Sequence, residues 1–308
     1  MSASARPLVQ KVATLAGHRD AVYGLTGGSE STIYSSSADG MVVAWDAAQP
    51  ERDGELLARV QNSVYALRHL PGLNLLVLGH NFQGIQAIDL AGKQLAYATA
   101  LPPVAIFEMV YSESRQRLYV GLGDGTLAVL AGPDFRLEKL LRLATKSLRT
   151  LALHEERAEL AVGSSDMLTR ILDLDTLAVK LTLGESTNSV FSVAYSPDGR
   201  RLLTAGRDAQ IRQWDVAAGY ALAGTVPAHM YTINHLAFSP DGRFLASCSL
   251  DKSIKLWDAG SLELLRVLDR ARHAGHGTSV NRLVWPGAEN RLVSCSDDRS
   301  LAVWEIAK

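Results

Sequence analysis

The chain consists of short apolar segments separated by polar turns, and this pattern recurs along its length. One unit contains a first apolar segment at residues 190–195, the turn Ser-Pro-Asp-Gly-Arg at 196–200, a second apolar segment, and a third that ends in a Trp-Asp pair. Pro and Gly in such a turn suit a tight reversal between strands. Because the segments are evenly spaced and too short for helices, they predict antiparallel β-strands.

The third segment of each unit aligns the units with one another. It reads VVAWD at 42–46, IRQWD at 211–215, IKLWD at 254–258 and LAVWE at 301–305, with degenerate copies IQAID at 85–89, TLAVL at 126–130 and TRILD at 169–173. The alignment positions Trp45, Ile88, Leu130, Leu172, Trp214, Trp257 and Trp304 are separated by 43, 42, 42, 42, 43 and 47 residues. A period of this length predicts seven copies of one supersecondary unit.

Three further positions recur in register with the Trp within these copies. Three copies contain a complete set, which reads His18, Ser35, Asp39, Trp45, then His229, Ser247, Asp251, Trp257, and then His276, Ser294, Asp298, Trp304. A fourth copy keeps Thr204, Asp208 and Trp214 but has Ser186 where the His would fall. This arrangement resembles the WD-repeat β-propeller family over almost the whole chain.

The resemblance implies an all-β, seven-bladed β-propeller whose blades are four-stranded antiparallel sheets. It predicts a single domain over residues 9–308, with residues 1–8 as a disordered tail. Only four residues follow Trp304, whereas residues 9–15 have the apolar character of a fourth strand. We therefore expect the N-terminal strand to complete blade seven and close the ring, which removes exposed sheet edges.

The recurring His, Ser or Thr, Asp and Trp positions predict a buried structural network rather than a catalytic triad. A triad is needed once, whereas this set recurs, and a buried Asp must be hydrogen-bonded to offset its desolvation. Blades two to four lack most of the set. Asp124 and Asp166 remain, but Leu130 and Leu172 replace Trp, and Phe82 stands where Asp would align. We expect these blades to depend more on plain apolar packing.

Composition narrows the class of protein without giving a function. Length alone suggests about two domains, but the repeat uses nearly all of the 308 residues. Lys and Arg total 31 against 32 Asp and Glu, so bulk charge does not favour a nucleic-acid partner. Neither an apolar membrane span nor a signal peptide is apparent, and two cysteines are too few for a disulfide framework. We expect a cytoplasmic protein without membrane contact.

Several motifs could carry chemistry but are better explained structurally. His273 and His276 form an H-x-x-H pair without an evident third ligand, so no metal is expected. The glycine-rich stretch 121–125 precedes no helix, so we predict a β-turn and no cofactor. Cys248 and Cys295 occupy equivalent strand positions and are expected to be buried. The connection that holds the His pair also contains a basic cluster, which could contact an anion but is more simply explained as a solvated loop. The cluster consists of Arg266, Arg270, Arg272 and His273.

The most informative positions follow the first apolar anchor of each blade. The resemblance places them at the entrance of the central channel, on what we call the top face, where the first strand of each blade begins. They are Tyr23, Tyr65, Phe107, Arg149, Phe191, Asn234 and Asn281. The residue before each network Asp is also expected on this face: Ala38, Gly123, Ser165, Arg207, Leu250 and Asp297, with Asn81 as the nearest match in blade two.

These positions predict a non-enzymatic scaffold, monomeric on its own, that binds a peptide or protein segment at the top face. Aromatic side chains supply rigid contact area and Arg can pair a carboxylate, although the aromatics could simply pack against neighbouring blades. An alternative is an enzyme that uses Glu108, His235 and Arg149 in the channel. Glu108, His235 and Arg282 could instead point between blades. A third possibility is a structural subunit that binds through an apolar rim on blades two to four.

Overall fold

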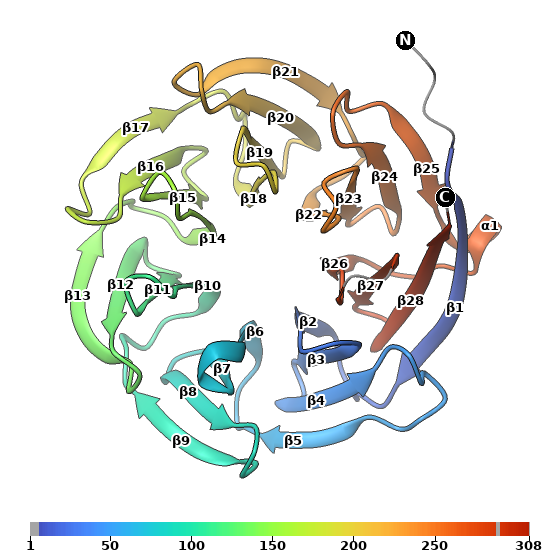
Figure 1. The fold of residues 1–308 in the computed structure, drawn as a ribbon, viewed down its shortest axis with the longest axis horizontal. Helices are drawn as coiled ribbons and strands as arrows, with labels where there is room; N and C mark the ends of the chain where they lie inside the picture. The colour runs from blue at the N-terminus through green and yellow to red at the C-terminus, as the bar shows by residue number, and fades with distance from the viewer. Residues whose placement is uncertain (1–5, 288–289, 308) are drawn as a thin grey trace.

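A computed structural model describes residues 6–287 and 290–307. Seven four-stranded antiparallel sheets are arranged as blades in a ring around a central channel (Figure 1). Each blade except the last uses four consecutive strands, the first on the channel and the fourth on the outside. This confirms the predicted all-β, seven-bladed propeller.

Blade one contains β2 (Val22–Gly27), β3 (Thr32–Ser37), β4 (Met41–Asp46) and β5 (Glu55–Arg59). Blade two contains β6 (Val64–Leu70), β7 (Leu75–His80), β8 (Gly84–Asp89) and β9 (Gln94–Thr99). Blade three contains β10 (Ile106–Ser112), β11 (Arg117–Leu122), β12 (Thr126–Ala131) and β13 (Arg136–Arg142). Blade four contains β14 (Leu148–His154), β15 (Glu159–Ser164), β16 (Thr169–Asp173) and β17 (Val179–Leu183).

Blade five contains β18 (Val190–Tyr195), β19 (Arg201–Gly206), β20 (Gln210–Asp215) and β21 (Ala221–Pro227). Blade six contains β22 (Ile233–Phe238), β23 (Phe244–Ser249), β24 (Ile254–Asp258) and β25 (Leu264–Leu268). Blade seven combines β26 (Val280–Val284), β27 (Arg291–Ser296) and β28 (Ser300–Ala307) with the N-terminal strand β1 (Leu8–Ala16).

The ring closes through the pairing of the two ends of the described chain. β1 runs antiparallel to β28, from Leu8 opposite Ala307 to Ala16 opposite Ser300. This confirms the predicted closure, although β1 begins one residue earlier than expected. Residues 1–5 of the predicted tail lie outside the described residues. Arg266 donates to the carbonyl oxygen of Pro7 at 2.8 Å, so the chain before β1 is held against blade six.

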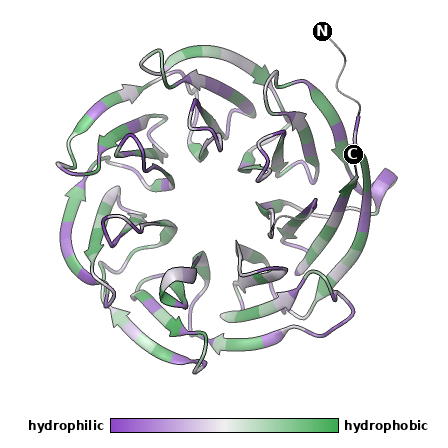
Figure 2. Cartoon of the chain, in the orientation of Figure 1, coloured by the Kyte–Doolittle hydropathy of each residue, from purple (hydrophilic) through white to green (hydrophobic). Residues whose placement is uncertain are grey.

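Short helical turns occupy two connections in the described part of the chain. They are the 3-10 turn η1 (Pro71–Leu73) and the single turn α1 (Arg270–His273). The side chain of Asp269 accepts a hydrogen bond from the backbone N–H of Arg272 and caps α1. α1 lies in the lengthened connection between blades six and seven, where only a loop was expected, and it is hydrophilic (Figure 2).

Apolar side chains fill the space between neighbouring blades. Leu130 and Leu172, which replace Trp in blades three and four, are fully buried. Ile88, at the same position in blade two, is 4% exposed. Removal of such side chains from water is the main force that holds the blades together. The expectation of plain apolar packing is incomplete for blade four, because Arg170 pairs with Asp166 at 2.7 Å.

Candidate functional site

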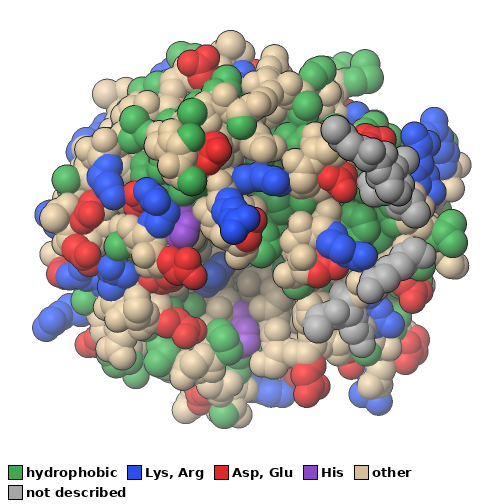
Figure 3. Space-filling view, turned by 45° about the horizontal axis from the view of Figure 1, so that its top comes forward, with side chains coloured by type: hydrophobic (Ala, Val, Ile, Leu, Met, Phe, Trp, Pro, Cys, Tyr) green, Lys and Arg blue, Asp and Glu red, His purple; other side chains and the backbone are tan. Residues whose placement is uncertain are grey.

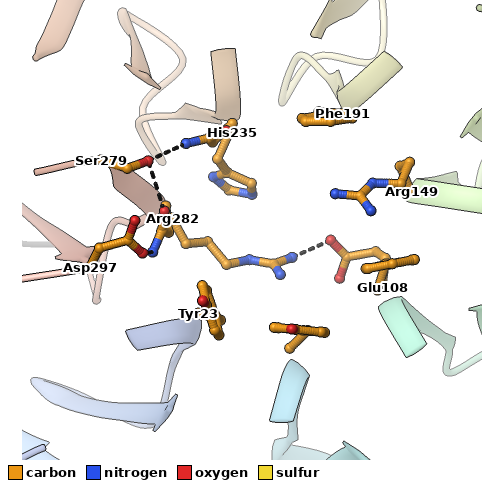
Figure 4. Close-up of a pocket in the computed structure, with 12 residues that line it drawn as sticks. Tyr23, Glu108, Arg149, Phe191, His235, Ser279, Arg282 and Asp297 are labelled. Atoms are coloured by element: carbon orange, nitrogen blue, oxygen red, sulfur yellow. Dashed lines mark hydrogen bonds and ion pairs between the residues drawn. The ribbon is translucent and has the colours of Figure 1, made fainter. Parts of the chain in front are cut away.

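The top face of the ring opens into a cavity of about 380 Å³ at the channel mouth. Each first strand starts at this face, so in an antiparallel blade the loops between second and third strands lie there too. Two groups of side chains form the wall, one aromatic and basic, the other polar (Figure 4). The lining residues are Tyr23, Tyr65, Phe107, Glu108, Arg149, Phe191, Asn234, His235, Ser279, Asn281, Arg282 and Asp297.

A β-bulge at the same place in all seven first strands positions the mouth residues. In blade one, Val22 pairs with Ser37 and Gly24 with Ser36, so Tyr23 has no partner on β3. The same register shift follows the first residue of β6, β10, β14, β18, β22 and β26. A bulged residue leaves the ladder and its side chain is re-aimed. The seven predicted mouth residues are these bulged residues, and all seven line the cavity.

An aromatic arc covers the mouth from blade one to blade five. The rings of Tyr23 and Tyr65 meet edge to face with centroids 4.7 Å apart, and Tyr65 stacks on Phe107 at 5.9 Å. The guanidinium of Arg149 continues the arc, because its carbon lies 3.9 Å from the centroid of Phe107 and 4.4 Å from that of Phe191. The cation therefore lies within cation–π distance of both rings.

A polar arc occupies the mouth in blades six and seven. The Asn234 amide donates to the hydroxyl of Ser279 at 3.0 Å and to the carbonyl of Val280 at 2.8 Å. The Asn281 amide donates to the carbonyl of Val22 at 2.9 Å and to Asp297 at 2.8 Å. These hydrogen bonds join blade six to blade seven and blade seven to blade one. The side-chain amide donors of Asn234 and Asn281 therefore already stabilise the fold.

An ion pair crosses the channel beneath the mouth. Glu108 of β10 and Arg282 of β26, which belong to blades three and seven, contact each other through carboxylate and guanidinium (Figure 4). Both side chains are largely buried, at 12% and 14% exposed. The exposed residue Arg68 lies near this pair, and the charges of Glu108 and Arg282 both act on it. The pair links opposite sides of the ring and forms a floor under the cavity.

Side chains directly after the bulge mostly face the next blade. The Thr150 hydroxyl accepts from the backbone N–H of Val193 at 3.1 Å, and Ser192 accepts from Leu236 at 3.0 Å. His235 occupies the same place, with Nδ1 at 3.4 Å from the N–H of Leu283, and also borders the cavity. Burial, and secondly the charge of Arg282, lowers the pKa of His235 well below its ordinary value. The expectation of inter-blade orientation therefore fits His235 but not Glu108 and Arg282.

The other predicted top-face residues fall outside the cavity, apart from Asp297. Arg207 is exposed on the loop between β19 and β20 and is not among the lining residues. Ser279 lines the cavity but was not predicted, because it directly precedes the first apolar anchor Val280, whereas the predicted positions follow that anchor. The Glu108–Arg282 pair was also missed, since no local pattern relates two residues so far apart in sequence.

The His-Ser-Asp-Trp sets form continuous hydrogen-bond chains in blades six and seven, which run from Trp through Ser and His to Asp. In blade six, Trp257 Nε1 donates to Ser247 Oγ at 2.9 Å, Ser247 lies 2.8 Å from His229 Nε2, and His229 Nδ1 lies 2.8 Å from Asp251. Blade seven repeats this with 2.9, 2.8 and 2.9 Å. The Ser hydroxyl accepts from Trp and donates its own proton to Nε2. In this arrangement His229 carries its proton on Nδ1 and donates it to Asp251.

The remaining blades vary this chain. In blade one, His18 Nδ1 is 3.4 Å from Asp39, so that contact is longer. Blade five retains the bond from Trp214 to Thr204 at 3.1 Å, and Arg212 pairs with Asp208 at 2.8 Å in place of His. Arg170 takes the same place beside Asp166 in blade four. The spacing of four residues between Asp and Arg is visible in the sequence and could have indicated this replacement.

The other motifs have structural explanations. Among the described residues no group of three or more His, Cys, Asp and Glu side chains is placed to hold a metal ion. Cys248 and Cys295 are buried, and burial raises the pKa of Cys295 to about 12. Within the stretch 121–125, residues 121 and 122 end β11, and residues 123–125 form the turn before β12, where Gly125 has a φ of +96°. No described helix is long and apolar enough to cross a membrane.

The family described as "WD domain, G-beta repeat" matches residues 9–46, 178–215, 221–258 and 264–305, about half of the chain. Similar curated proteins include "Periodic tryptophan protein 2" of Saccharomyces cerevisiae, 27% identical over 68% of this chain and 21% of that protein. "Coronin-7" of Mus musculus is 31% identical over 38% of this chain and 14% of that protein. The chain thus spans well under half the length of these relatives.

A solved structure agrees over the whole ring. The WD40 β-propeller domain of Doa1 superimposes with a TM-score of 0.84 and covers 96% of this chain and 97% of that one. Its sequence identity of 19% shows the fold alone. The family matches fall on blades one, five, six and seven, which keep the Trp of the repeat, and the structural match extends to the degenerate blades two to four. The chain therefore belongs to the WD domain, G-beta repeat family of β-propellers.

Proposed function

We propose that the protein is a non-enzymatic interaction scaffold that binds a peptide or partner-protein segment over the channel mouth. The observation that carries the proposal is the mouth itself, where aromatic rings and Arg149 line an open cavity. Rigid aromatic side chains and Arg are the residue types that dominate binding energy at interfaces. The family resemblance also favours such a role, since WD-repeat propellers usually act as interaction platforms.

The distribution of exposed apolar side chains supports use of the top face. Among the described residues, large exposed apolar side chains in loops occur only on this face. They are Phe82, Met167, Met230, Tyr231 and Leu250. The others lie on strands β1, β5, β9, β13, β17, β21 and β25 at the outside of the ring. Exposed apolar groups beside a polar rim are typical of protein-binding surfaces.

The test is affinity capture from the native cell with the intact protein and two variants. The first combines Tyr65→Ala with Phe107→Ala at the mouth; the second is Tyr97→Ala, a partly exposed aromatic on outer strand β9. We expect a partner that the wild type and Tyr97→Ala retain and that the mouth variant loses. Retention by all three proteins, or loss only with Tyr97→Ala, would contradict binding at the mouth.

Catalysis in the channel is the first alternative. Glu108, His235 and Arg149 do border one cavity, which is what an enzyme would require. However, Glu108 is paired with Arg282, and the lowered pKa of His235 makes it a weak base. The site therefore supports binding better than proton transfer.

A structural role in a larger assembly is the second alternative. The outer strands of blades two to four each expose two large apolar side chains: Leu95 and Tyr97, Leu137 and Leu140, Val179 and Leu181. The Tyr97→Ala variant addresses this rim directly.

We include in the proposal a single domain over residues 9–308, a monomeric propeller, a cytoplasmic location, and a protein partner rather than nucleic acid or membrane. Side chains of both charge signs are interspersed on the surface in view (Figure 3), and the formal net charge is −1. Binding of nucleic acid generally depends on a basic face.

A further inference from the structure

Arg149 offers hydrogen-bond donors that the described protein does not use. The rings of Phe107 and Phe191 lie within cation–π distance of its guanidinium carbon. A cation–π contact supplies no hydrogen-bond acceptor, so it leaves the N–H donors of the guanidinium without partners. No described residue accepts a hydrogen bond from Arg149 or forms an ion pair with it, and its side chain points into the cavity (Figure 4).

The charge of Arg149 is also uncompensated. Glu108, one of the two carboxylates that line the cavity, is paired with Arg282. Asp297 belongs to blade seven and accepts from Asn281. Burial lowers the pKa of Arg149, which is the effect expected for a cation that has lost water without gaining a counter-charge. A ligand that brings a negative charge to this place would therefore gain a charge-assisted contact.

We propose that the guanidinium of Arg149 binds a carboxylate of the docked peptide, and so sets the chemistry that the mouth recognises. A planar carboxylate matches the two-pronged edge of a guanidinium and can accept two parallel hydrogen bonds. A carboxylate brings one negative charge, which matches the one positive charge of Arg149, whereas a dianionic phosphate would add a second negative charge to a cavity that already holds Asp297.

The inference rests on the proposed function, and its test separates the two. A random twelve-residue peptide library is selected on the intact protein, and the strongest binder is synthesised with its acidic side chains intact or as amides, and with its C-terminus free or amidated. These forms distinguish a side-chain carboxylate from a terminal one. Affinities are measured for the wild type, Arg149→Gln, Arg149→Lys, and the matched control Arg207→Gln, whose arginine lies outside the cavity.

We expect a selected peptide in which one carboxylate is required. Its conversion to an amide should weaken binding to the wild type about tenfold or more, the effect of losing a charged hydrogen bond. Arg149→Gln should weaken binding similarly, and the amide peptide should then lose little further. Arg149→Lys should be intermediate, because it keeps charge but not the planar fork, and Arg207→Gln should match the wild type.

Two different outcomes would overturn the inference. If the peptide loses affinity with Tyr65→Ala and Phe107→Ala but not with Arg149→Gln, the mouth binds peptides without a carboxylate contact, and only the proposed function stands. If no peptide is selected, or if binding ignores all mouth variants, both fail. Melting temperature and circular dichroism of Arg149→Gln check that any loss does not come from misfolding.

Discussion

At the scale of single residues, one hydroxyl joins three elements in each complete network. Ser247 of β23 accepts from Trp257 of β24 and donates to His229, which lies before β22. Because the Trp Nε1–H has only this acceptor, the hydroxyl cannot be removed without leaving buried polar groups unpaired. The same geometry at Ser294 makes blades six and seven equivalent in this respect.

Replacement of Ser247 with Ala should therefore destabilise the protein by about 1–3 kcal/mol, the usual cost of leaving buried hydrogen-bonding groups unsatisfied. Urea denaturation of the intact protein measures the change. Ser261→Ala, in the exposed turn after Asp258, is the matched control and should change stability by less than about 0.5 kcal/mol. Equal stability of the two variants would contradict the role of the network.

The pH dependence of stability follows from the neutral histidines. Burial lowers the pKa of His18 and His229, although Asp39 and Asp251 oppose that shift. The unfolded chain therefore binds protons as pH falls through about 6.5, whereas the folded network resists them. Stability should be constant above that pH and decline below it. Melting curves between pH 8 and 5 measure this dependence. His229→Gln should reduce stability at pH 8 and should also make the loss of stability below pH 6.5 less steep. An unchanged loss of stability below pH 6.5 would contradict the role of His229.

At the scale of strands, the bulge in each first strand determines what the channel contains. It turns the second residue of all seven strands toward the mouth, while the next residue meets the neighbouring blade. Glu108 and Arg282 are the exceptions, because their longer side chains reach across the channel to each other. Strands from opposite blades are thus connected without any shared sheet.

Glu108→Gln should destabilise the fold, because it leaves Arg282 largely buried near Arg68 without its counter-charge. Breaking one side of a buried pair costs about 3–5 kcal/mol. The double variant Glu108→Gln with Arg282→Met removes both charges and should recover part of that loss. Chemical denaturation of the two variants and the wild type measures this. If the double variant is less stable than Glu108→Gln alone, the charge argument is wrong.

At the scale of the whole molecule, β1 converts an open stack of blades into a ring. It lies against β28 over the full strand, and Leu15 is buried in the core shared with blade one. Without it, blade seven would expose an unpaired edge, which favours aggregation. Closure thus couples the two ends of the described chain and makes unfolding cooperative.

Leu15→Ala should lower stability by about 2–5 kcal/mol, as expected for a large buried side chain. Leu8→Ala, at the exposed beginning of the same strand, should have almost no effect. Deletion of residues 1–16 should abolish cooperative melting and reduce solubility. Thermal denaturation followed by circular dichroism measures all three, and an unchanged transition in the deletion variant would contradict closure by β1.

The sequence by itself determined the repeat, the number of blades and the closing strand. These features depend on apolar periodicity and on the His, Ser, Asp and Trp spacing, which are local along the chain. It also identified the seven mouth positions, because each follows an apolar anchor at a fixed distance, with their place in the channel implied by family resemblance. The spacing of four residues after the Asp could also have predicted that Arg170 and Arg212 take the place of His.

Only the tertiary structure decided how these residues meet. The bulge is a property of pairing between strands, so no single strand reveals it. The Glu108–Arg282 pair joins blades three and seven, and the stacking of Arg149 joins blades three, four and five. Asn234 and Asn281 were predicted binding residues, yet their amide donors join neighbouring blades. Such contacts depend on closure of the ring, which brings side chains distant in sequence within hydrogen-bonding range.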